Sequence, residues 1–423
     1  MKREWTTFQT IAAFIVVVFA AGVILYGFSY LDDEKNNTTV NIDDETARAL
    51  WGGGNGTPND PYLIYNATQL HNIRYGLDKS FKLMADIDLD AEGFDNDGDP
   101  VNGNFEPIGK HEYNRDRRAS NNFEVSAAFR GNFDGNGHTI SNMHLDLPDN
   151  QYVGLFGFAV SVDGKNNSIS NVTLVNMTAD GHRYVGSVAG VIFSEDNSTM
   201  SVISCNVSGF VNCSEDSNGG IVGAAGAEDG GNTTIQNCIF TGTMNGNNHV
   251  GGIIGEFSSD NATMAIISCT ATKPVAGLRD DIGGIVGGFS ATNCGNSSVI
   301  SCQAVGVSRG EKMVGGIAGS IEATNDSMAL ISNCSSNGDV VGENSNIGGI
   351  VGFVYAYDGI TTISSCFSTG TVISEGIQAN YTTPGGVGGL VGSGKNENVQ
   401  IIDSEFIGIV IDPSDPKYYN QTN

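Results

Sequence analysis

The sequence predicts an all-β fold: a parallel β-solenoid (β-helix) of about nine coils, at about 32–33 residues per repeat, preceded by one N-terminal apolar α-helix. Three observations predict it: a repeat of nearly constant length, a high glycine content and one long uncharged segment near the start. The 58 glycines in 423 residues are about twice the average share of about 7%. That content is untypical of helical bundles, and 39% apolar residues are too many for a disordered chain.

The N-terminal segment is the first predicted element. No charge interrupts residues 5–31, and residues 11–28 are almost continuously apolar. A helix of this length, rising about 1.5 Å per residue, spans the hydrocarbon core of a membrane, which is about 30 Å thick. Lys2 and Arg3 precede the segment, so we expect that end in the cytoplasm. Residues 1–31 are therefore predicted to be a single-pass anchor in the cell membrane, with the C-terminal part extracellular.

Two alternatives to a retained anchor stay open. A cleaved secretory signal has an apolar region of about 7–15 residues that ends in a small-residue cleavage site. Here the apolar region is longer, and the Phe-Ser-Tyr-Leu sequence at residues 28–31 fits such a site poorly. A pilin-type leader would place the helix in the core of a filament, but no Gly or Ala follows the basic residues where such leaders are cut.

The repeat follows an acidic polar linker, residues 32–50. A glycine-framed apolar block recurs eight times at nearly constant spacing, from Val153-Gly-Leu-Phe-Gly157 to Val387-Gly-Gly-Leu-Val-Gly392. Each period also contains three short β-type runs separated by Gly, Asn, Asp and Ser. One such unit cannot bury its apolar face alone, so neighbouring units must stack. We assign residues 51–142 to an N-terminal cap and first coils, 143–410 to the repeats and 411–423 to a C-terminal tail.

A second block in each repeat places cysteine at a constant position, near the middle of the interval between two glycine blocks. In a solenoid these cysteines form an inward ladder, and Met143, Val172 and Ser404 hold the same position in other copies. Stacked Cα atoms about 4.8 Å apart fall within the range of a disulfide, so the cysteines could pair between coils. The interpretation we favour is that they are small buried apolar side chains that stack for packing. The ladder residues are Cys205, Cys238, Cys269, Cys302, Cys334 and Cys366. Cys213 and Cys294 are expected in loops, off the ladder.

Seventeen Asn-x-Ser/Thr acceptor sequences agree with an extracellular location, since about seven are expected by chance. Glycosylation requires a translocated, exposed chain. The alternative is that repeats rich in Asn, Ser and Thr generate such triplets incidentally. The candidate acceptors are Asn36, Asn37, Asn55, Asn66, Asn166, Asn171, Asn176, Asn197, Asn206, Asn212, Asn232, Asn261, Asn296, Asn325, Asn333, Asn380 and Asn420.

The two repeated blocks resemble GLUG repeats, in which glycine, leucine, an apolar residue and glycine follow one another. The resemblance continues upstream, for example in Gly56-Thr-Pro-Asn-Asp-Pro-Tyr-Leu-Ile64, and covers residues 52 to about 410. It implies a surface-exposed bacterial or archaeal protein, similar to the non-catalytic region of immunoglobulin A metallopeptidases. Those enzymes carry His-Glu-x-x-His in a separate domain. The six histidines of this chain form no such motif, so we do not expect protease activity.

Seven carboxylates lie between residues 86 and 99, and one part of this run could bind a metal ion. Asp95, Asp97 and Asp99 alternate around a glycine turn, which lets their oxygens converge as a hard cation requires. The run lacks the full loop and the bidentate Glu of an EF-hand, so the alternative is a polar surface turn. A structural calcium ion is the one candidate cofactor, and we expect that the protein requires no cofactor.

The charge balance limits the partners. Twenty Lys and Arg against 47 Asp and Glu give −27, which excludes nucleic acid as a partner because its phosphates would be repelled. We expect that the protein is not an enzyme but a structural or adhesive scaffold at the cell surface. Its expected partners are a surface glycan, a matrix or cell-surface protein, or copies of itself. One alternative is a surface-filament subunit. A calcium-dependent polysaccharide lyase or hydrolase is a further alternative, although basic residues such as Lys273, Arg279 and Lys312 are scattered.

Overall fold

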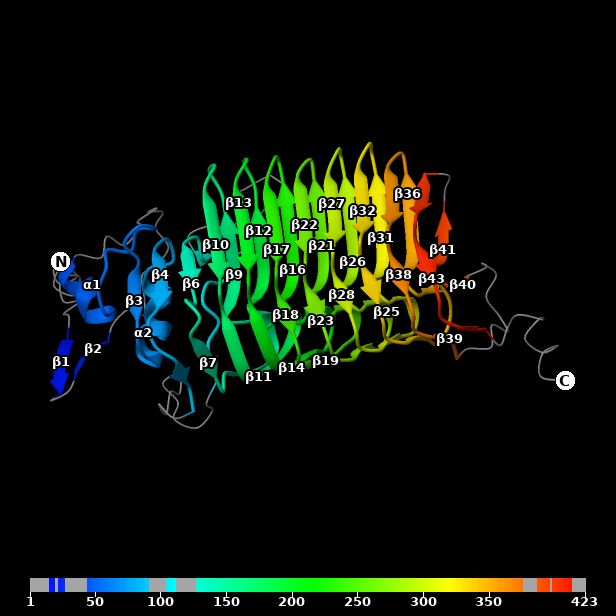
Figure 1. The fold of residues 1–423 in the computed structure, drawn as a ribbon. Helices are drawn as coiled ribbons and strands as arrows, with labels where there is room; N and C mark the ends of the chain where they lie inside the picture. Colours follow the sequence, from blue (N-terminus) through cyan, green and yellow to red (C-terminus); the bar gives the residue numbers. More distant parts are fainter. Residues whose placement is uncertain are drawn as a thin grey trace, which may run out of the picture.

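The computed structural model describes residues 15–19, 22–26, 44–90, 104–111, 127–375, 386–395 and 398–412. Figure 1 shows an elongated stack of coils, with short helices at one end. Each coil passes through three parallel sheets before it rises to the next coil. We name these sheets face A, face B and face C. The predicted parallel β-solenoid is therefore confirmed.

Face A is a sheet of eleven parallel strands. Every second side chain of these strands points into the core, and one inward column reads Ile235, Ile266, Val299, Ile331 and Ile363 in successive strands. The strands are β3 (Tyr62–Ile64), β4 (Ser80–Leu83), β6 (Asn132–Asp134), β10 (Asn166–Ser170), β13 (Thr199–Ile203), β17 (Asn232–Gln236), β22 (Thr263–Ile267), β27 (Asn296–Ile300), β32 (Met328–Ser332), β37 (Ile360–Ser364) and β42 (Val399–Ile402).

Face B is a sheet of eight parallel strands that follow the glycine blocks. These strands delimit seven complete turns, slightly fewer than the nine coils predicted, because the first segments of the chain reach faces A and C without forming a face-B strand. They are β9 (Phe156–Ser161), β12 (Ala189–Ser194), β16 (Val222–Glu228), β21 (Ile254–Asp260), β26 (Val286–Thr292), β31 (Ala318–Thr324), β36 (Val351–Tyr357) and β41 (Val391–Lys395).

Face C bends, and most of its strands are short. They are β5 (Ile87–Asp88), β7 (Thr139–Ser141), β8 (His144–Val153), β11 (Thr173–Gly186), β14 (Asn206–Cys213), β15 (Asp216–Gly219), β18 (Ile239–Phe240), β19 (Thr243–Gly246), β20 (Asn248–Gly251), β23 (Thr270–Ala271), β24 (Val275–Gly277), β25 (Asp280–Gly283), β28 (Gln303–Ala304), β29 (Ser308–Gly310), β30 (Lys312–Gly315), β33 (Ser335–Ser336), β34 (Val340–Gly342), β35 (Ile347–Gly348), β38 (Phe367–Ser368), β39 (Val372–Ser374), β40 (Val387–Gly388), β43 (Glu405–Phe406) and β44 (Val410–Ile411).

Helices cover the N-terminal end of the core. They are α1 (Asp44–Leu50), α2 (Ala67–His71) and the 3₁₀-helix η1 (Asn72–Tyr75). Trp51 follows α1 and stacks on Tyr62 of β3, with ring centroids 4.3 Å apart. Helix α1 lies inside the predicted linker, residues 32–50, so that assignment is corrected for residues 44–50. The reason is that Ala47 and Leu50 pack into the cap.

The part of the predicted anchor helix that the structure describes is not helical. Two antiparallel strands, β1 (Ile15–Phe19) and β2 (Gly22–Tyr26), lie there instead. Their sequences are rich in β-branched Val and Ile, which lose side-chain freedom in a helix and favour strands. Among the described residues, none of the helices has the length and apolar character needed to cross a membrane.

Candidate functional site

Three corners per coil turn the chain from one face to the next, and each uses a residue with a left-handed backbone. This conformation disfavours most side chains, and Gly, Asn, Asp and His tolerate it best. The corner from face B to face A uses Asp or Asn in each turn, with Cys294 as an additional residue in one turn. The corner before each ladder position uses Asn, Ser or Asp, as at Asn237, Ser268 and Ser301. Except at the serines and at Cys294, both corners therefore follow the backbone preference.

The third left-handed position lies in or directly before the last face-C strand of each coil, where the chain bends toward face B, and it departs from that preference. Its left-handed residues include two tyrosines and a methionine, with φ between 49° and 62°. A left-handed backbone costs a residue with a Cβ about 1–2 kcal/mol. We call this set the corner column: Tyr152, Tyr184, Ser217, His249, Asp281, Met313 and Asn346.

The glycine blocks explain how such side chains come to lie over face B. Gly287 closes one block, and a Cβ at this position would lie 2.5 Å from the backbone of His249 and from the carbonyl oxygen of Gly255. The absence of a side chain there lets the corner of one coil pack directly on the next coil. Tyr152, Tyr184 and His249 of the corner column line the outer surface of face B, whereas Ser217 is buried.

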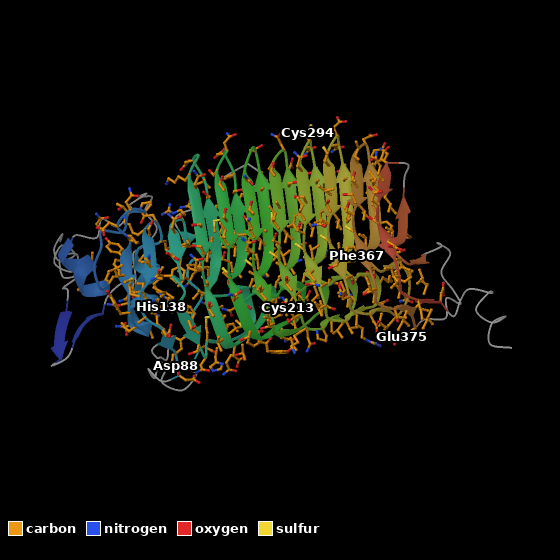
Figure 2. The ribbon with its side chains drawn as sticks, in the orientation of Figure 1. Asp88, His138, Cys213, Cys294, Phe367 and Glu375 are labelled. Carbon is orange, nitrogen blue, oxygen red and sulfur yellow. The ribbon has the colours of Figure 1, made fainter. Side chains whose placement is uncertain are left out.

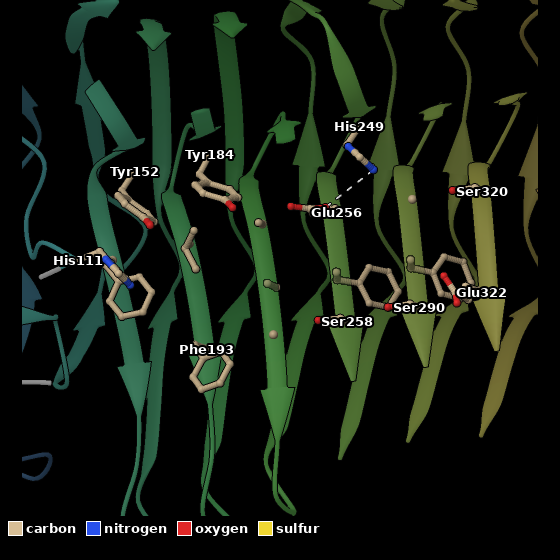
Figure 3. Close-up of a pocket in the computed structure, with 18 residues that line it drawn as sticks. His111, Tyr152, Tyr184, Phe193, His249, Glu256, Ser258, Ser290, Ser320 and Glu322 are labelled. Carbon is tan, nitrogen blue, oxygen red and sulfur yellow. Dashed lines mark ion pairs between the residues drawn. The ribbon is translucent and has the colours of Figure 1, made fainter. Parts of the chain in front are cut away.

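A groove of about 500 Å³ lies on the outer surface of face B, beside the corner column. That volume is in the range of about 300–1,000 Å³ that is usual for ligand sites. Figure 3 shows Tyr184 on one side of β16 and Glu256 on the other. The floor between them is made of small residues, Ala224 and Gly226 on β16 and Ser258 on β21. Ser290 and Ser320 continue this floor on β26 and β31.

Aromatic rings form one end of the groove. His111, Tyr152 and Tyr184 stack in series, with ring centroids 4.8 Å and 5.2 Å apart. Burial raises the pKa values of Tyr152 and Tyr184, so both hydroxyls stay protonated at neutral pH and can donate hydrogen bonds. Burial also lowers the pKa of His111, whose imidazole is therefore uncharged at neutral pH. This end combines apolar ring surface with polar hydroxyl groups.

A histidine between two carboxylates lies further along the groove. His249 Nε2 is 3.3 Å from Asp281 Oδ2 and 4.0 Å from Glu256 Oε2. Ser217 Oγ donates a hydrogen bond of 2.6 Å to Glu256 Oε1. Burial raises the pKa of Asp281, and this effect outweighs the opposite effect of His249. His249 Nδ1 and Asp281 Oδ1 are buried without a hydrogen-bond partner, so this cluster retains hydrogen-bonding capacity.

Sequence reasoning did not identify this cluster, because it found no paired carboxylates near a repeated groove position. A signal existed in the spacing. His249 and Asp281 lie one repeat apart in the sequence, and both directly precede the apolar residue of a glycine block. Residues at one position of successive repeats become neighbours in a solenoid, so alignment of the repeats would have brought the two together.

The cationic side chains beside the corner column are engaged in ion pairs. The guanidinium of Arg183 lies 2.5 Å from Asp216 Oδ2. Burial would raise the pKa of Asp216, but hydrogen bonds from Asn248 and Arg183 and the charge of Arg183 lower it overall. Lys312 Nζ lies 3.6 Å from Asp280 Oδ2. The described residues that line the groove include two Glu but no Lys or Arg.

The structure buries all six ladder cysteines, and no disulfide joins them. The backbone N–H groups of Cys238, Cys269 and Cys302 each point to the sulfur of the next cysteine, at 3.4–3.5 Å. Cys213 corrects an expectation, because it ends β14 and is buried rather than lying in a loop (Figure 2). Burial raises the pKa of Cys213 to about 12. Cys294 lies exposed at the turn after β26.

The predicted calcium ligands Asp95, Asp97 and Asp99 lie outside the described residues, so calcium binding there stays a prediction. Among the residues that the structure does describe, no three His, Cys, Asp or Glu side chains are grouped so that they could hold a metal ion.

Thirteen candidate glycosylation acceptors fall on described residues, and Asn36, Asn37, Asn380 and Asn420 do not. Eleven of the thirteen are exposed, and Asn66 and Asn212 are partly buried. The acceptors lie in the N-terminal cap, on faces A and C, and at two of the corners. The eight face-B strands contain no asparagine, and none of the acceptors belongs to the corner column.

Comparisons with known proteins agree with the predicted repeat. The GLUG motif matches residues 343–373, which confirms the resemblance for that repeat. The chain is 34% identical over 222 residues, 51% of its length, to halomucin of Haloquadratum walsbyi, and this match spans 2% of halomucin. It is 29% identical over 258 residues, 60% of its length, to a candidate Gly-rich membrane protein of Evansella cellulosilytica, of which the match spans 24%.

A solved structure resembles the chain weakly. It is the crystal structure of an immunoglobulin A1 protease candidate from Bacteroides ovatus, with a TM-score of 0.48 and 18% sequence identity. The match covers 88% of this chain and 91% of that chain. At this level of similarity it supports no inference about activity.

Proposed function

We propose that the chain is a membrane-anchored extracellular glycoprotein whose β-solenoid is a structural and adhesive scaffold. The observation that carries this proposal is the difference between the three faces. Acceptor asparagines lie in the cap, on faces A and C and at two corners, whereas face B carries a groove and has no acceptor on its strands. Glycans on the other faces would keep them soluble and leave face B open for contact with a ligand.

The anchor in this proposal is residues 5–31. In water, β1 and β2 satisfy some backbone groups by pairing with each other. Inside a bilayer the outer edges of such a pair would be left without partners, at a cost of several kcal/mol for each group. A helix satisfies all of its backbone groups within the segment, so we propose that residues 5–31 become helical on insertion. The similarity to a candidate membrane protein supports this anchor.

The test uses intact cells that produce the full chain. Labelling with a membrane-impermeant amine reagent, followed by membrane fractionation, should modify lysines of the solenoid and place the chain in the membrane fraction. Glycopeptide mass spectrometry of the same material should detect modified acceptors on faces A and C. A chain that stays unlabelled until the cells are lysed would contradict the proposal.

One observation favours the hydrolase alternative, namely the two carboxylates around His249. Glycosidases also use two carboxylates, but they flank the scissile bond with about 5–9.5 Å of free space between them. Here the imidazole of His249 contacts both groups and lies where that bond would have to be. This geometry fits binding better than cleavage. We therefore expect purified chain to release no reducing ends from neutral or acidic polysaccharides, with or without calcium.

A further inference from the structure

In the corner column, the left-handed positions do not keep the residue types found at the other corners. At the two other corners, the left-handed positions hold Asn, Asp or Ser in nearly every coil. In the corner column, Tyr152, Tyr184 and Met313 occupy the same backbone conformation, which disfavours such side chains. Backbone strain of this kind is typical of functional sites. The observation suggests that these side chains serve a purpose other than making the turn.

The groove beside the column has the shape of a site for a linear molecule. Its lining extends from β9 across to β31, which are six adjacent strands of face B. Five strand spacings of about 4.8 Å give a length of about 24 Å along the solenoid. Small residues such as Gly226 and Ser258 keep the floor low over most of this length. A chain molecule could therefore lie along the stack and contact several coils.

The chemistry of the lining fits a saccharide. Tyr152 is stacked between His111 and Tyr184, and the guanidinium of Arg183 lies over the Tyr184 ring, so the two tyrosines offer ring edges and hydroxyl donors. Phe193 adds apolar surface to the same end of the groove. Glu256, Glu322 and the serines of the floor offer acceptors and donors at intervals along the groove. Sugars present the same combination, because each ring has an apolar face and an edge of hydroxyl groups.

The charge of the lining selects among saccharides. Glu256 and Glu322 line the groove, and Asp281 contacts His249 at its edge. Arg183 and Lys312, the nearby cations, are ion-paired with Asp216 and Asp280. An acidic sugar would meet Glu256 and Glu322 in a lining that contains no Lys or Arg, whereas hydroxyl and amino groups can donate hydrogen bonds to these carboxylates.

We propose that the face-B groove binds a saccharide chain without acidic groups, with Tyr184, Glu256 and Ser258 as contact residues. This inference deepens the adhesive role proposed above and rests on it. The ligand lies along the solenoid axis, its hydroxyl or amino groups bonded to Glu256 and its rings against the aromatic end.

Isothermal titration calorimetry on the full chain in nanodiscs tests the proposal. The probes are hexamers of glucose (β-1,3 and β-1,4), xylose, mannose, N-acetylglucosamine and glucosamine, with hexagalacturonate as the acidic probe. We expect at least one neutral or amino hexamer to bind at least ten-fold more tightly than hexagalacturonate. Failure of every neutral and amino hexamer to bind, or tighter binding of hexagalacturonate, would overturn the proposal.

Matched variants locate the site. Tyr184→Ala and Glu256→Gln should each weaken binding of that hexamer at least ten-fold, and Ser258→Trp should abolish it by filling the groove. The controls lie on face C: Phe367→Ala removes an exposed ring, Glu343→Gln removes an exposed carboxylate, and Thr243→Trp adds an indole. Circular dichroism melting checks that each variant is folded. Equal affinity of the groove variants and the controls would overturn the assignment to face B.

A comparison with the cell-labelling experiment separates this inference from the proposed function. If the chain is labelled on intact cells but binds none of the neutral or amino hexamers, the surface location holds and the groove assignment fails. If the purified chain binds a hexamer through Tyr184 but is not labelled on cells, the groove assignment holds and the surface location fails.

Discussion

The inward column of face A and the corner column differ in how far they keep one residue type, although both have one member in each successive coil. The inward column reads Ile, Ile, Val, Ile and Ile from Ile235 to Ile363, and all five side chains are fully buried. The corner column changes residue type in almost every coil and tolerates an unfavourable backbone. Packing against the same neighbours selects the same residue each time, whereas contact with a ligand does not. Repeats within one chain thus separate structural positions from candidate functional ones.

The largest effect is expected from truncation of the inward column. Ile363 is 0% exposed, and its register partner in the last described coil, Ile401, is 48% exposed because no described coil covers it. Ile363→Ala should lower the free energy of unfolding by about 2–5 kcal/mol, since it removes buried methyl groups and leaves a cavity. Urea denaturation followed by circular dichroism measures this value.

Ile401→Ala is the matched control for that prediction. This change removes the same atoms from the same column, but at a site that water already reaches. It should therefore lower the free energy of unfolding by less than about 1 kcal/mol. Equal losses of unfolding free energy at both positions would show that the described end of the stack is covered. The expected difference in stability between inner and terminal coils would then be wrong.

A smaller effect, of opposite sign, is expected in the corner column. Met313→Asn should raise the free energy of unfolding by about 1 kcal/mol, because Asn tolerates the left-handed backbone better than Met. The reverse change at the corner between faces B and A, Asn261→Met, should lower it by a similar amount. Thermal melting of both variants checks the pair. If Met313→Asn destabilises the chain, the methionine contributes packing, and our view of the column as strained fails.

A pH-dependent effect should distinguish two neighbouring carboxylates. The pKa of Asp281 is raised by burial, so its contribution to stability is present below the unfolded pKa of about 3.9 and is lost as pH rises through the folded pKa. Asp281→Asn should therefore stabilise the chain at pH 7 and have little effect at pH 3. Each pKa unit of the shift corresponds to about 1.4 kcal/mol.

Asp216 should behave in the opposite way, because its pKa is lowered. Its ionised form contributes stability above the unfolded pKa, and this contribution is lost as pH falls through the folded pKa. Asp216→Asn should destabilise the chain at pH 7 and lose that effect in acid. Melting temperatures of both variants between pH 3 and pH 7 provide the measurement, and shifts of the same sign would contradict the roles we assign to burial and to Arg183.

The sequence was sufficient to predict the solenoid, because the glycine blocks and the ladder cysteines recur in register. It predicted too many coils, since the early segments repeat the motifs before face B exists. The helices of the cap were missed because α1 and α2 are too short to show a sustained helical period. The groove was missed for another reason. Its residues are unusual only in comparison with the same positions of other coils. The left-handed backbone that makes Tyr152 and Tyr184 exceptional is a property of the fold and cannot be seen in the sequence.

The most direct test of our central claim is a double variant, Tyr184→Asn with His249→Asn, in which unfolding and binding are measured on the same sample. We predict that the thermal midpoint stays equal or rises, while affinity for the best neutral or amino hexamer falls at least ten-fold. A lower midpoint with unchanged affinity would show that these side chains serve the fold, and it would contradict the assignment of the corner column to ligand binding.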